Sequence, residues 1–302
     1  MSVALPDERS ILHRRFLHST VELIGPVAAP AFSPTASIAE ALTTLKDSPL
    51  GCVVITDQGK LLGIFTERDL LIKCAGLPEF PAQRPLEEFM TKDPQSIRPS
   101  ASVARLLHLM SVGGFRHVPV VGPRAGQLRI VSSKHFVDFI YKSVTKKIAA
   151  GPDDCVLDDN QVDKVFTKPV SFLKPTKPVL VKPTEAIAGV VAMLISGKIG
   201  SVVVCDNQSH ALGIFTERDY LCKIAVNSAL DPYMAPVSQF MTTEPRTVPA
   251  ATSVAELFNL MSEGGYRHLP VVDSKGAVTG MISVKTFIDF FTSSILGELH
   301  AA

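Results

Sequence analysis

Apolar and polar positions follow a pattern that occurs four times along this chain. Each copy has apolar residues spaced three and four apart, as in Ile38–Leu45 and Val254–Met261, which predicts a helix with one buried face. A short β-rich run follows, such as Cys52–Thr56 or Ser201–Cys205, and then a polar turn and a second apolar run. A second helix comes directly after. We therefore predict units of helix, strand, strand and helix with an extended lead-in, too small to close a core without a neighbour.

Residue identities repeat over a longer distance and pair the four copies into two halves. Leu62–Lys73 and Leu212–Lys223 match at ten of twelve positions, and Gly113–Val121 and Gly264–Val272 match at seven of nine. The offsets of 150 and 151 residues keep the halves in register. Internal repetition of this kind fixes the architecture before any single residue does. Each half is long enough that we expect it to bury a core of its own.

The repeats predict the domain organisation. We expect an N-terminal helical extension over 1–20, a first pair of units over 21–145, a linker over 146–165 and a second pair over 166–302. The single units cover about 21–76, 86–145, 166–226 and 237–296. Residues Pro6–Thr20 mix charged and apolar positions as a short amphipathic helix does, and 146–164 is polar and acidic like a linker.

Composition narrows the class of protein. The 302 residues are 46% hydrophobic, yet no apolar run approaches the roughly 18 residues of a membrane span. The net charge of +1 gives no overall case for nucleic acid. Five scattered cysteines without a CxxC pair predict a reducing compartment and packing roles for the thiols. The N-terminus lacks a secretory pattern, so we expect a soluble, cytoplasmic protein.

The segment Thr66–Asp69 reads TERD, and Thr216–Asp219 repeats it; we call these the two TERD turns. Each follows an apolar strand and begins a helix, so its threonine and aspartate favour a capping box. The same geometry suits a ligand, because a helix N-terminus can receive phosphate and an aspartate can accept hydrogen bonds from both ribose hydroxyls. On this motif alone, the sequence favours the capping interpretation over ligand binding.

Arg116-His117 and its copy Arg267-His268 each precede a Pro-Val-Val strand. One interpretation is a charged lead-in to the strand, with the histidine capping or packing. The other is phosphate binding, in which arginine offers a fork of donors and histidine a tunable charge. The glycine pair before each motif suits the end of the preceding helix.

Together, the extended lead-in, the helix, the RH(V/L)PVV strand and the GIFTERD segment resemble the CBS domain, named for cystathionine β-synthase. The resemblance covers roughly Val21–Leu296. It implies an α/β fold of the α+β type, with four βαββα CBS units paired into two Bateman modules, a layout similar to the gamma subunit of AMP-activated protein kinase. It also implies an adenosine-type ligand, AMP, ADP, ATP or S-adenosylmethionine, in the cleft between two units.

The resemblance assigns roles to particular residues. Thr66 with Asp69, and Thr216 with Asp219, would contact phosphate and ribose. Arg116, His117, Arg267 and His268 would contact phosphate, and the lead-ins Met90–Ile97 and Met241–Val248 would border the base. The second unit carries Ser132 and His135 at the TERD positions, and the fourth carries Ser283 and Thr286. Neither His135 nor Thr286 offers a carboxylate, so we predict one competent site per half and leave open what the other clefts bind.

Three functions follow as hypotheses. The first is a non-catalytic regulatory sensor that binds an adenine nucleotide, changes conformation and signals to a regulated protein partner. The second is an enzyme, but the sequence shows no nucleophile–base pair and no metal-binding cluster. We therefore expect no metal and no catalytic cofactor. The third is a structural scaffold or oligomerisation module that no longer binds ligand. Membrane and nucleic-acid partners are not expected. The sequence does not choose between a four-unit disc in one chain and a homodimer, although apolar faces at Phe136–Ile140 and Phe287–Phe291 suit association through helices.

Overall fold

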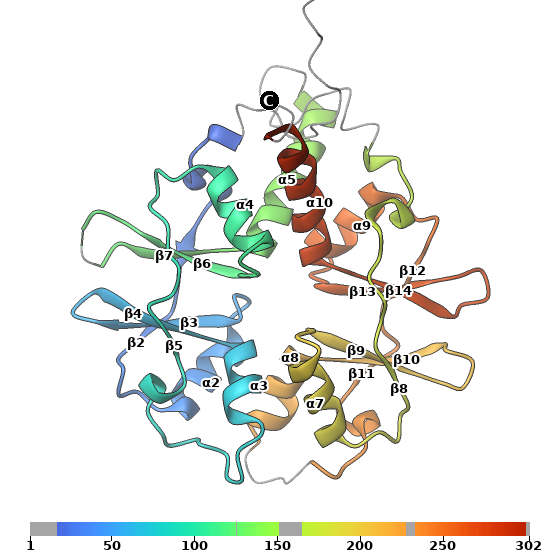
Figure 1. Ribbon diagram of the computed structural model, residues 1–302, viewed down its shortest axis with the longest axis horizontal. Coiled ribbons are helices and arrows are strands. Elements are labelled where there is room, and N and C mark those ends of the chain that lie inside the picture. The colour runs from blue at the N-terminus through green and yellow to red at the C-terminus, as the bar shows by residue number, and fades with distance from the viewer. Residues whose placement is uncertain (1–16, 125, 151–164, 228–232, 300–302) are drawn as a thin grey trace, which may run out of the picture.

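The computed structural model describes residues 17–124, 126–150, 165–227 and 233–299, which form four small α/β units around a common centre (Figure 1). The first half lies on the left of the view and the second half on the right. The expected N-terminal helix falls mostly outside the described residues, as does most of the expected linker. The helix α5 (Ser133–Ala150) continues past residue 145, so its last turn occupies the start of the segment expected to be a linker.

Each unit has its own sheet, built on the antiparallel hairpin that the sequence predicts. In the first half the strand orders are β2-β3-β4-β5 (Ala31–Phe32, Cys52–Asp57, Lys60–Thr66, Thr91–Lys92) and β1-β7-β6 (Val27–Ala28, Leu128–Ser132, His117–Val121). In the second half they are β11-β10-β9-β8 (Thr242–Thr243, Ala211–Thr216, Ser201–Cys205, Leu180–Val181) and β12-β13-β14 (Val248–Pro249, His268–Val272, Val278–Ser283).

In each half, the helices lie on the outer faces of the two sheets, away from the sheet of the other unit (Figure 1). The α-helices besides α5 are α2 (Ile38–Asp47), α3 (Glu67–Cys74), α4 (Val103–Ser111), α7 (Ile187–Ser196), α8 (Glu217–Asp219), α9 (Val254–Ser262) and α10 (Val284–Leu299). Short 3₁₀ turns are η1 (Val21–Ile24), η2 (Leu86–Glu88), η4 (Val170–Leu173) and η6 (Val237–Gln239), and η5 (Tyr220–Ala225) is a π-helix. Thus α3 is regular, whereas its copy widens after Asp219, where the buried Tyr220 replaces Leu70.

The lead-in segments join the two units of each half. In the first half, β1 pairs with β7 of the second unit, and β2, only a few residues later, pairs with β3 of the first unit. The segment between the units does the same in reverse, because β5 pairs with β4 of the first unit before Ile97 pairs with Val120 of the second. Every lead-in therefore contributes to two sheets, and neither sheet of a pair is complete without its neighbour's segment.

The hydrophobic core crosses between the halves. One cluster combines the first and third units and includes Leu45, Phe65 and Phe215, all with no exposed surface. A second cluster combines the second and fourth units, where Phe136 lies edge-on to Phe291 with ring centroids 5.8 Å apart. The expectation that each half buries a core of its own holds for one smaller cluster in each half: Cys52, Val54, Ile64 and Ile130 in the first, and Val203, Cys205, Ile214, Val272, Val278 and Met281 in the second. The two larger clusters are shared between the halves. Burial of a large apolar side chain contributes about 1.5–3 kcal/mol, so the shared clusters stabilise the contact between the halves.

Equivalent hydrogen bonds also run in both directions between the second and fourth units. Ser111 Oγ donates to Asp289 of the second half across 2.8 Å, and Ser262 Oγ donates to Asp138 of the first half across 2.9 Å. Such exchange of equivalent contacts is typical of a two-fold interface between identical subunits. Here the two partners belong to one chain, so the four-unit disc closes within it. The apolar faces at Phe136–Ile140 and Phe287–Phe291 pack against each other inside this chain.

Candidate functional site

Both TERD turns form a capping box. In the first half, Asp69 Oδ2 accepts hydrogen bonds from the Thr66 amide (3.0 Å) and hydroxyl (2.7 Å), and the Asp69 amide donates to Thr66 Oγ1 (3.2 Å). Asp219 and Thr216 repeat the arrangement with distances of 2.9, 2.7 and 3.1 Å. The capping interpretation of the motif is confirmed, and it uses only one oxygen of each carboxylate.

The two units without a carboxylate are capped as well. The Ser132 amide donates to His135 Nδ1 at 3.1 Å, and the Ser283 amide donates to Thr286 Oγ1 at 3.1 Å. A cap at this junction therefore needs an acceptor but no aspartate. What Asp69 and Asp219 add is a second oxygen, Oδ1, that the cap leaves available.

That second oxygen points to the lead-in strand of the neighbouring unit. Asp219 Oδ1 accepts from Thr242 Oγ1 at 2.8 Å and lies 2.7 Å from Lys223 Nζ. Asp69 Oδ1 accepts from Thr91 Oγ1 at 2.6 Å and lies 2.7 Å from Lys73 Nζ. The oxygen that ribose hydroxyls would need is therefore directed at the segment that the sequence expects beside the base.

A cavity of about 510 Å³ opens beside Asp219. Its wall combines the TERD turn, lead-in residues Thr242 and Glu244–Arg246, and the strand entry Gly265–His268. Four residues of the first half complete it: Pro49, Glu67, Arg116 and Lys134. Tyr266, which is 40% exposed, also lines it. A volume of this size suits a small organic ligand, and polar groups converge on it from several elements.

The arginines of the RH motifs cross the centre of the molecule. Arg116 Nη1 donates to Glu217 at 2.6 Å, and Arg267 Nη1 donates to Glu67 at 2.9 Å. Each arginine thus pairs with a carboxylate of the opposite half. Arg116, a candidate phosphate contact that belongs to the first half, lies on the wall of the second-half cavity. Sequence position could not reveal this, because the partner lies far along the chain.

The two histidines beside these arginines bring no positive charge. Burial, together with the nearby Arg267, lowers the pKa of His117 to about 3, and burial with Arg116 lowers the pKa of His268 to about 3. His117 Nε2 lies 2.6 Å from the Leu50 carbonyl oxygen, to which the neutral ring donates its proton. Near neutral pH both rings are therefore uncharged. They can offer hydrogen bonds to a phosphate but not the positive charge that the phosphate-binding interpretation included.

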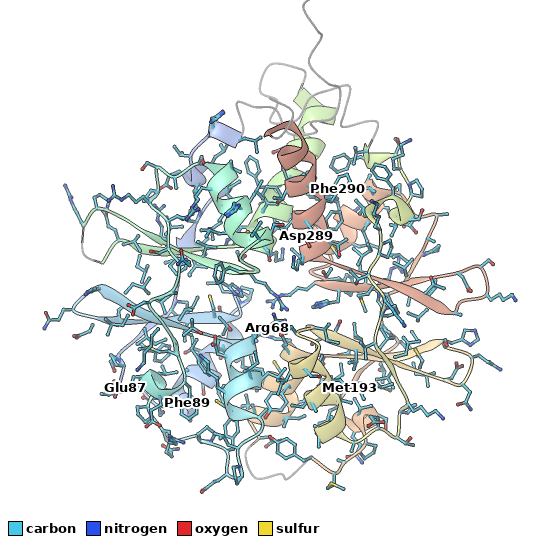
Figure 2. All side chains as sticks on the ribbon, viewed as in Figure 1. Arg68, Glu87, Phe89, Met193, Asp289 and Phe290 are labelled. Atoms are coloured by element: carbon cyan, nitrogen blue, oxygen red, sulfur yellow. The ribbon has the colours of Figure 1, made fainter. Side chains whose placement is uncertain are left out.

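The middle residues of the TERD turns, to which the sequence motif assigned no role, are buried and paired. Glu67 and Glu217 are 4% and 3% exposed, although they open short helices at the surface of their own units. Arg68 Nε donates to Glu217 at 2.8 Å, and Arg218 Nη1 donates to Glu67 at 3.0 Å. Figure 2 shows Arg68 near the middle of the molecule. The available signal was the identity of both turns at all four positions, since a cap alone requires only the first and the last.

The arginines of the TERD turns also cap helices of the opposite half. Arg218 Nη1 donates to the carbonyl oxygens of Leu45 (2.7 Å) and Ser48 (3.2 Å) at the end of α2. Arg68 Nη2 donates to the Lys198 carbonyl at 3.2 Å, just after α7. A cation at a helix C-terminus is favourable because the last carbonyls are otherwise unpaired. Each turn is therefore fixed by its own cap and by a helix of the other half.

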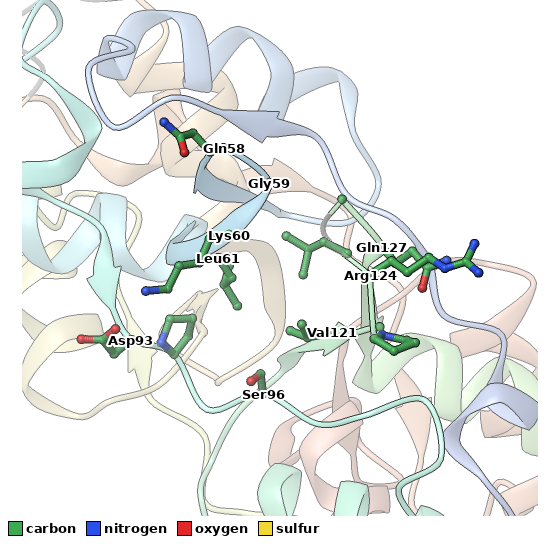
Figure 3. Close-up of a pocket in the computed structure, with 14 residues that line it drawn as sticks. Gln58, Gly59, Lys60, Leu61, Asp93, Ser96, Val121, Arg124 and Gln127 are labelled. Atoms are coloured by element: carbon green, nitrogen blue, oxygen red, sulfur yellow. The ribbon is translucent and has the colours of Figure 1, made fainter.

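The outer ends of the hairpins differ between the halves. In the first half, the Gly126 amide of the β6–β7 turn donates to the Gly59 carbonyl of the β3–β4 turn at 3.4 Å. A cavity of about 470 Å³ lies between these hairpins, with Lys60 and Asp93 at one end and Arg124 at the other (Figure 3). Neither TERD residue Thr66 nor Asp69 lines it. In the second half the corresponding turns are joined, because His210 Nε2 lies 3.0 Å from the Lys275 carbonyl and the Val278 amide donates to Ser209.

Other expected features concern cysteines, membrane segments and metals. Burial raises the pKa of the Cys52 and Cys74 thiols to about 12, and that of Cys205 to about 11, in keeping with packing roles. Within the described ranges, no helix has the length and apolar character needed to cross a membrane. In the same part of the chain, no group of three His, Cys, Asp or Glu side chains is arranged to hold a metal ion.

Comparison with known proteins establishes the family. The CBS domain model matches residues 26–76, 86–142 and 237–293, so the chain belongs to the CBS-domain family. The third unit has the same hairpin and the same strand-to-helix TERD junction as the first. The four units therefore form two Bateman modules, as the resemblance implied.

Similar proteins are known from plants, yeast and archaea. The chain is 26% identical over 270 residues to CBS domain-containing protein CBSCBSPB1 of Arabidopsis thaliana, covering 83% of this chain and 49% of that protein. It is 26% identical over 292 residues to the meiotically up-regulated gene 70 protein of Schizosaccharomyces pombe, covering 77% and 38%. The chain thus spans half or less of these relatives.

A solved structure has the same fold. Protein MJ1225 of Methanocaldococcus jannaschii, proposed to be an archaeal homologue of γ-AMPK, superposes with a TM-score of 0.70 at 15% identity. The match covers 90% of this chain and 99% of that one. This chain and that protein therefore share the same overall fold.

Proposed function

We propose that this chain is a non-catalytic regulatory module that binds an adenine nucleotide and signals by a change of conformation. The observation that carries the proposal is the cavity that joins Asp219 to Arg116 and Arg267. In it, Asp219 Oδ1 and Thr242 would hold the ribose, the half-exposed Tyr266 would lie against the base, and the two arginines would hold phosphate. His268 would contribute a neutral ring. The family and its γ-AMPK-like fold support this class of ligand.

The first half carries the same residues in the same cap, so we propose Thr66 and Asp69 as a second ribose site. The signal would arise because the ligand contacts both halves, so that it favours one arrangement of the disc over another. The effect on a regulated partner can be no larger than the difference in ligand affinity between the arrangements.

One observation favours the alternative of a scaffold without ligand. Both aspartates are already satisfied by protein donors, including Lys73 and Lys223, which ribose hydroxyls would have to replace. A ligand-free structural role would explain the same contacts without any nucleotide.

Calorimetry with AMP, ADP, ATP and S-adenosylmethionine separates these functions. A ligand at a hundredfold excess over Kd should stabilise the protein by about 2.7 kcal/mol. Asp219→Thr reproduces the cap of the fourth unit, where Thr286 serves without a carboxylate, so the variant should fold and lose at least tenfold in nucleotide affinity. Asp69→Thr is the matched variant of the first half. Wild-type protein that binds none of the four compounds would favour the scaffold.

A further inference from the structure

The two glutamates at the centre stand between the two halves. Glu67 accepts from Arg218 and Arg267, both of the second half. Glu217 accepts from Arg68 and Arg116, both of the first half. Four arginines share two carboxylates, so the cluster holds two more positive than negative charges while both histidines are neutral. Because the glutamates are almost fully buried, these pairs are weakly screened by solvent.

The second-half cavity exposes part of this cluster to a ligand. Arg116 and Arg267 line it together with the carboxylates that they hold, Glu217 and Glu67. A phosphate group that reaches the arginines therefore also meets the two carboxylates that these arginines already hold. Like charges in a partly buried site repel strongly, so phosphate and glutamate cannot both keep their best contacts with the same guanidinium. A neutral nucleoside meets no such opposition.

Glu217 also connects the cavity to a residue outside it. Arg68 does not line the cavity, yet its Nε donates to Glu217 Oε1. Arg68 is the residue before Asp69 in the first TERD turn and donates its Nη2 to Lys198 of the second half. If Arg116 gives up its hydrogen bond to Glu217, the carboxylate that Arg68 also contacts changes its environment. Arg68 lies next to Asp69, the proposed ribose contact of the first half.

We propose that Glu67 and Glu217 compete with the ligand's phosphate for Arg267 and Arg116, and that this competition couples the second-half cavity to the TERD turn of the first half. The competition makes affinity depend on the charge of the ligand. It acts reciprocally, because a coupling between two binding sites changes both affinities by the same factor. This inference rests on the proposed function for its physiological ligand, but its physical content concerns any phosphate anion in the cavity.

The test compares Glu217→Gln with wild-type protein, using calorimetry with inorganic pyrophosphate, AMP and adenosine. Glutamine keeps the shape and an acceptor but removes the charge. We expect pyrophosphate and AMP to bind at least threefold more tightly to the variant, and adenosine to change less than twofold. The control is Glu79→Gln, which removes the same charge from an exposed loop. Pyrophosphate affinity in Glu217→Gln equal to or below that of the control overturns the proposal.

A second measurement is made on the wild-type protein, and a variant of the cluster serves only to assign one resonance. The Arg68 Nε–H resonance in the wild-type protein, assigned by its loss in Arg68→Lys, reports on Glu217 without contact to the ligand. Saturation with pyrophosphate should shift it, and an unshifted resonance overturns the coupling. The two proposals fail separately. Wild-type protein that binds pyrophosphate but neither AMP nor adenosine contradicts the nucleotide function alone, whereas normal AMP binding with no effect of Glu217→Gln contradicts the competition alone.

Discussion

Arg116 Nη1 lies 2.6 Å from Oε2 of Glu217, although the two residues are 101 positions apart and belong to different halves. The contact has an equivalent in Arg267 with Glu67, so the halves exchange identical ion pairs across the centre. These pairs stand where the nucleotide's phosphate is proposed to bind. Stability of the disc and the chemistry of the site therefore depend on the same side chains.

The first prediction concerns the energy of this pair. A double-mutant cycle with Arg116→Met and Glu217→Gln should give a coupling free energy of about 1–3 kcal/mol in urea unfolding, because Glu217 is buried and the contact is close. The exposed pair of Arg129 with Glu22 is the control, and its coupling should stay below about 1 kcal/mol. Equal coupling in both cycles would contradict the view that the central pair is tightly held.

The second prediction concerns acid. The folded protein keeps His268 neutral down to a pKa of about 3, whereas the unfolded chain takes up this proton near the usual value of 6.5. The unfolded state therefore binds more protons between these values, and stability falls as the pH is lowered through this window. Replacement by His268→Gln should reduce the slope of unfolding free energy against pH by up to about 1.4 kcal/mol per unit. A slope for His268→Gln equal to that of the wild-type protein would refute the assignment.

The third prediction concerns the joined hairpins of the second half. Both ring nitrogens of His210 face acceptors, Asp206 Oδ2 at 3.1 Å and the Lys275 carbonyl at 3.0 Å, so only the imidazolium satisfies both. The hydrogen bond with Asp206 and that with Lys275 raise the pKa of His210, with a further contribution from the Asp273 carboxylate. Lys275 contributes its main-chain oxygen.

The stability due to a raised pKa is present below the unfolded value of 6.5 and is lost as the pH rises through the folded one. We therefore expect His210→Asn to lower the Tm at about pH 5.5 and to have little effect at about pH 8. Lys60→Asn, at the matching position of the first hairpin, should show no difference between these two pH values. A Tm loss for His210→Asn that is the same at both would contradict the prediction.

The fourth prediction concerns the lead-in of the second half. A Cβ at Gly280 would lie 2.7 Å from Cβ of Pro175, whose ring cannot turn away. Gly280→Ala should therefore push the lead-in off β14 and lower the unfolding free energy by about 1–3 kcal/mol. Gly76→Ala, where a Cβ would meet nothing within 4 Å, is the control. Chemical denaturation of both variants measures the difference, and equal midpoints would show that the lead-in adjusts freely.

The local structure of this protein follows from its amino-acid sequence. The spacing of apolar residues predicted α2, α3 and α9 and the hairpin strands, because a helix or strand buries one face at its own period. The repeated motifs predicted four units and the family. They also located both TERD caps, since a capping box involves residues only three positions apart.

The shared cores and the ion pairs between the halves depend on how the four units pack together. Leu45 and Phe215 lie in one cluster, and Glu67 faces Arg267 from 200 positions away. Such contacts leave no periodic trace in the chain, because they depend on how whole units dock. For the same reason the sequence could not show that Arg116 contacts Glu217 of the other half. Its pairing with Glu217 results from closure of the disc, which buries the two glutamates and requires that each be paired.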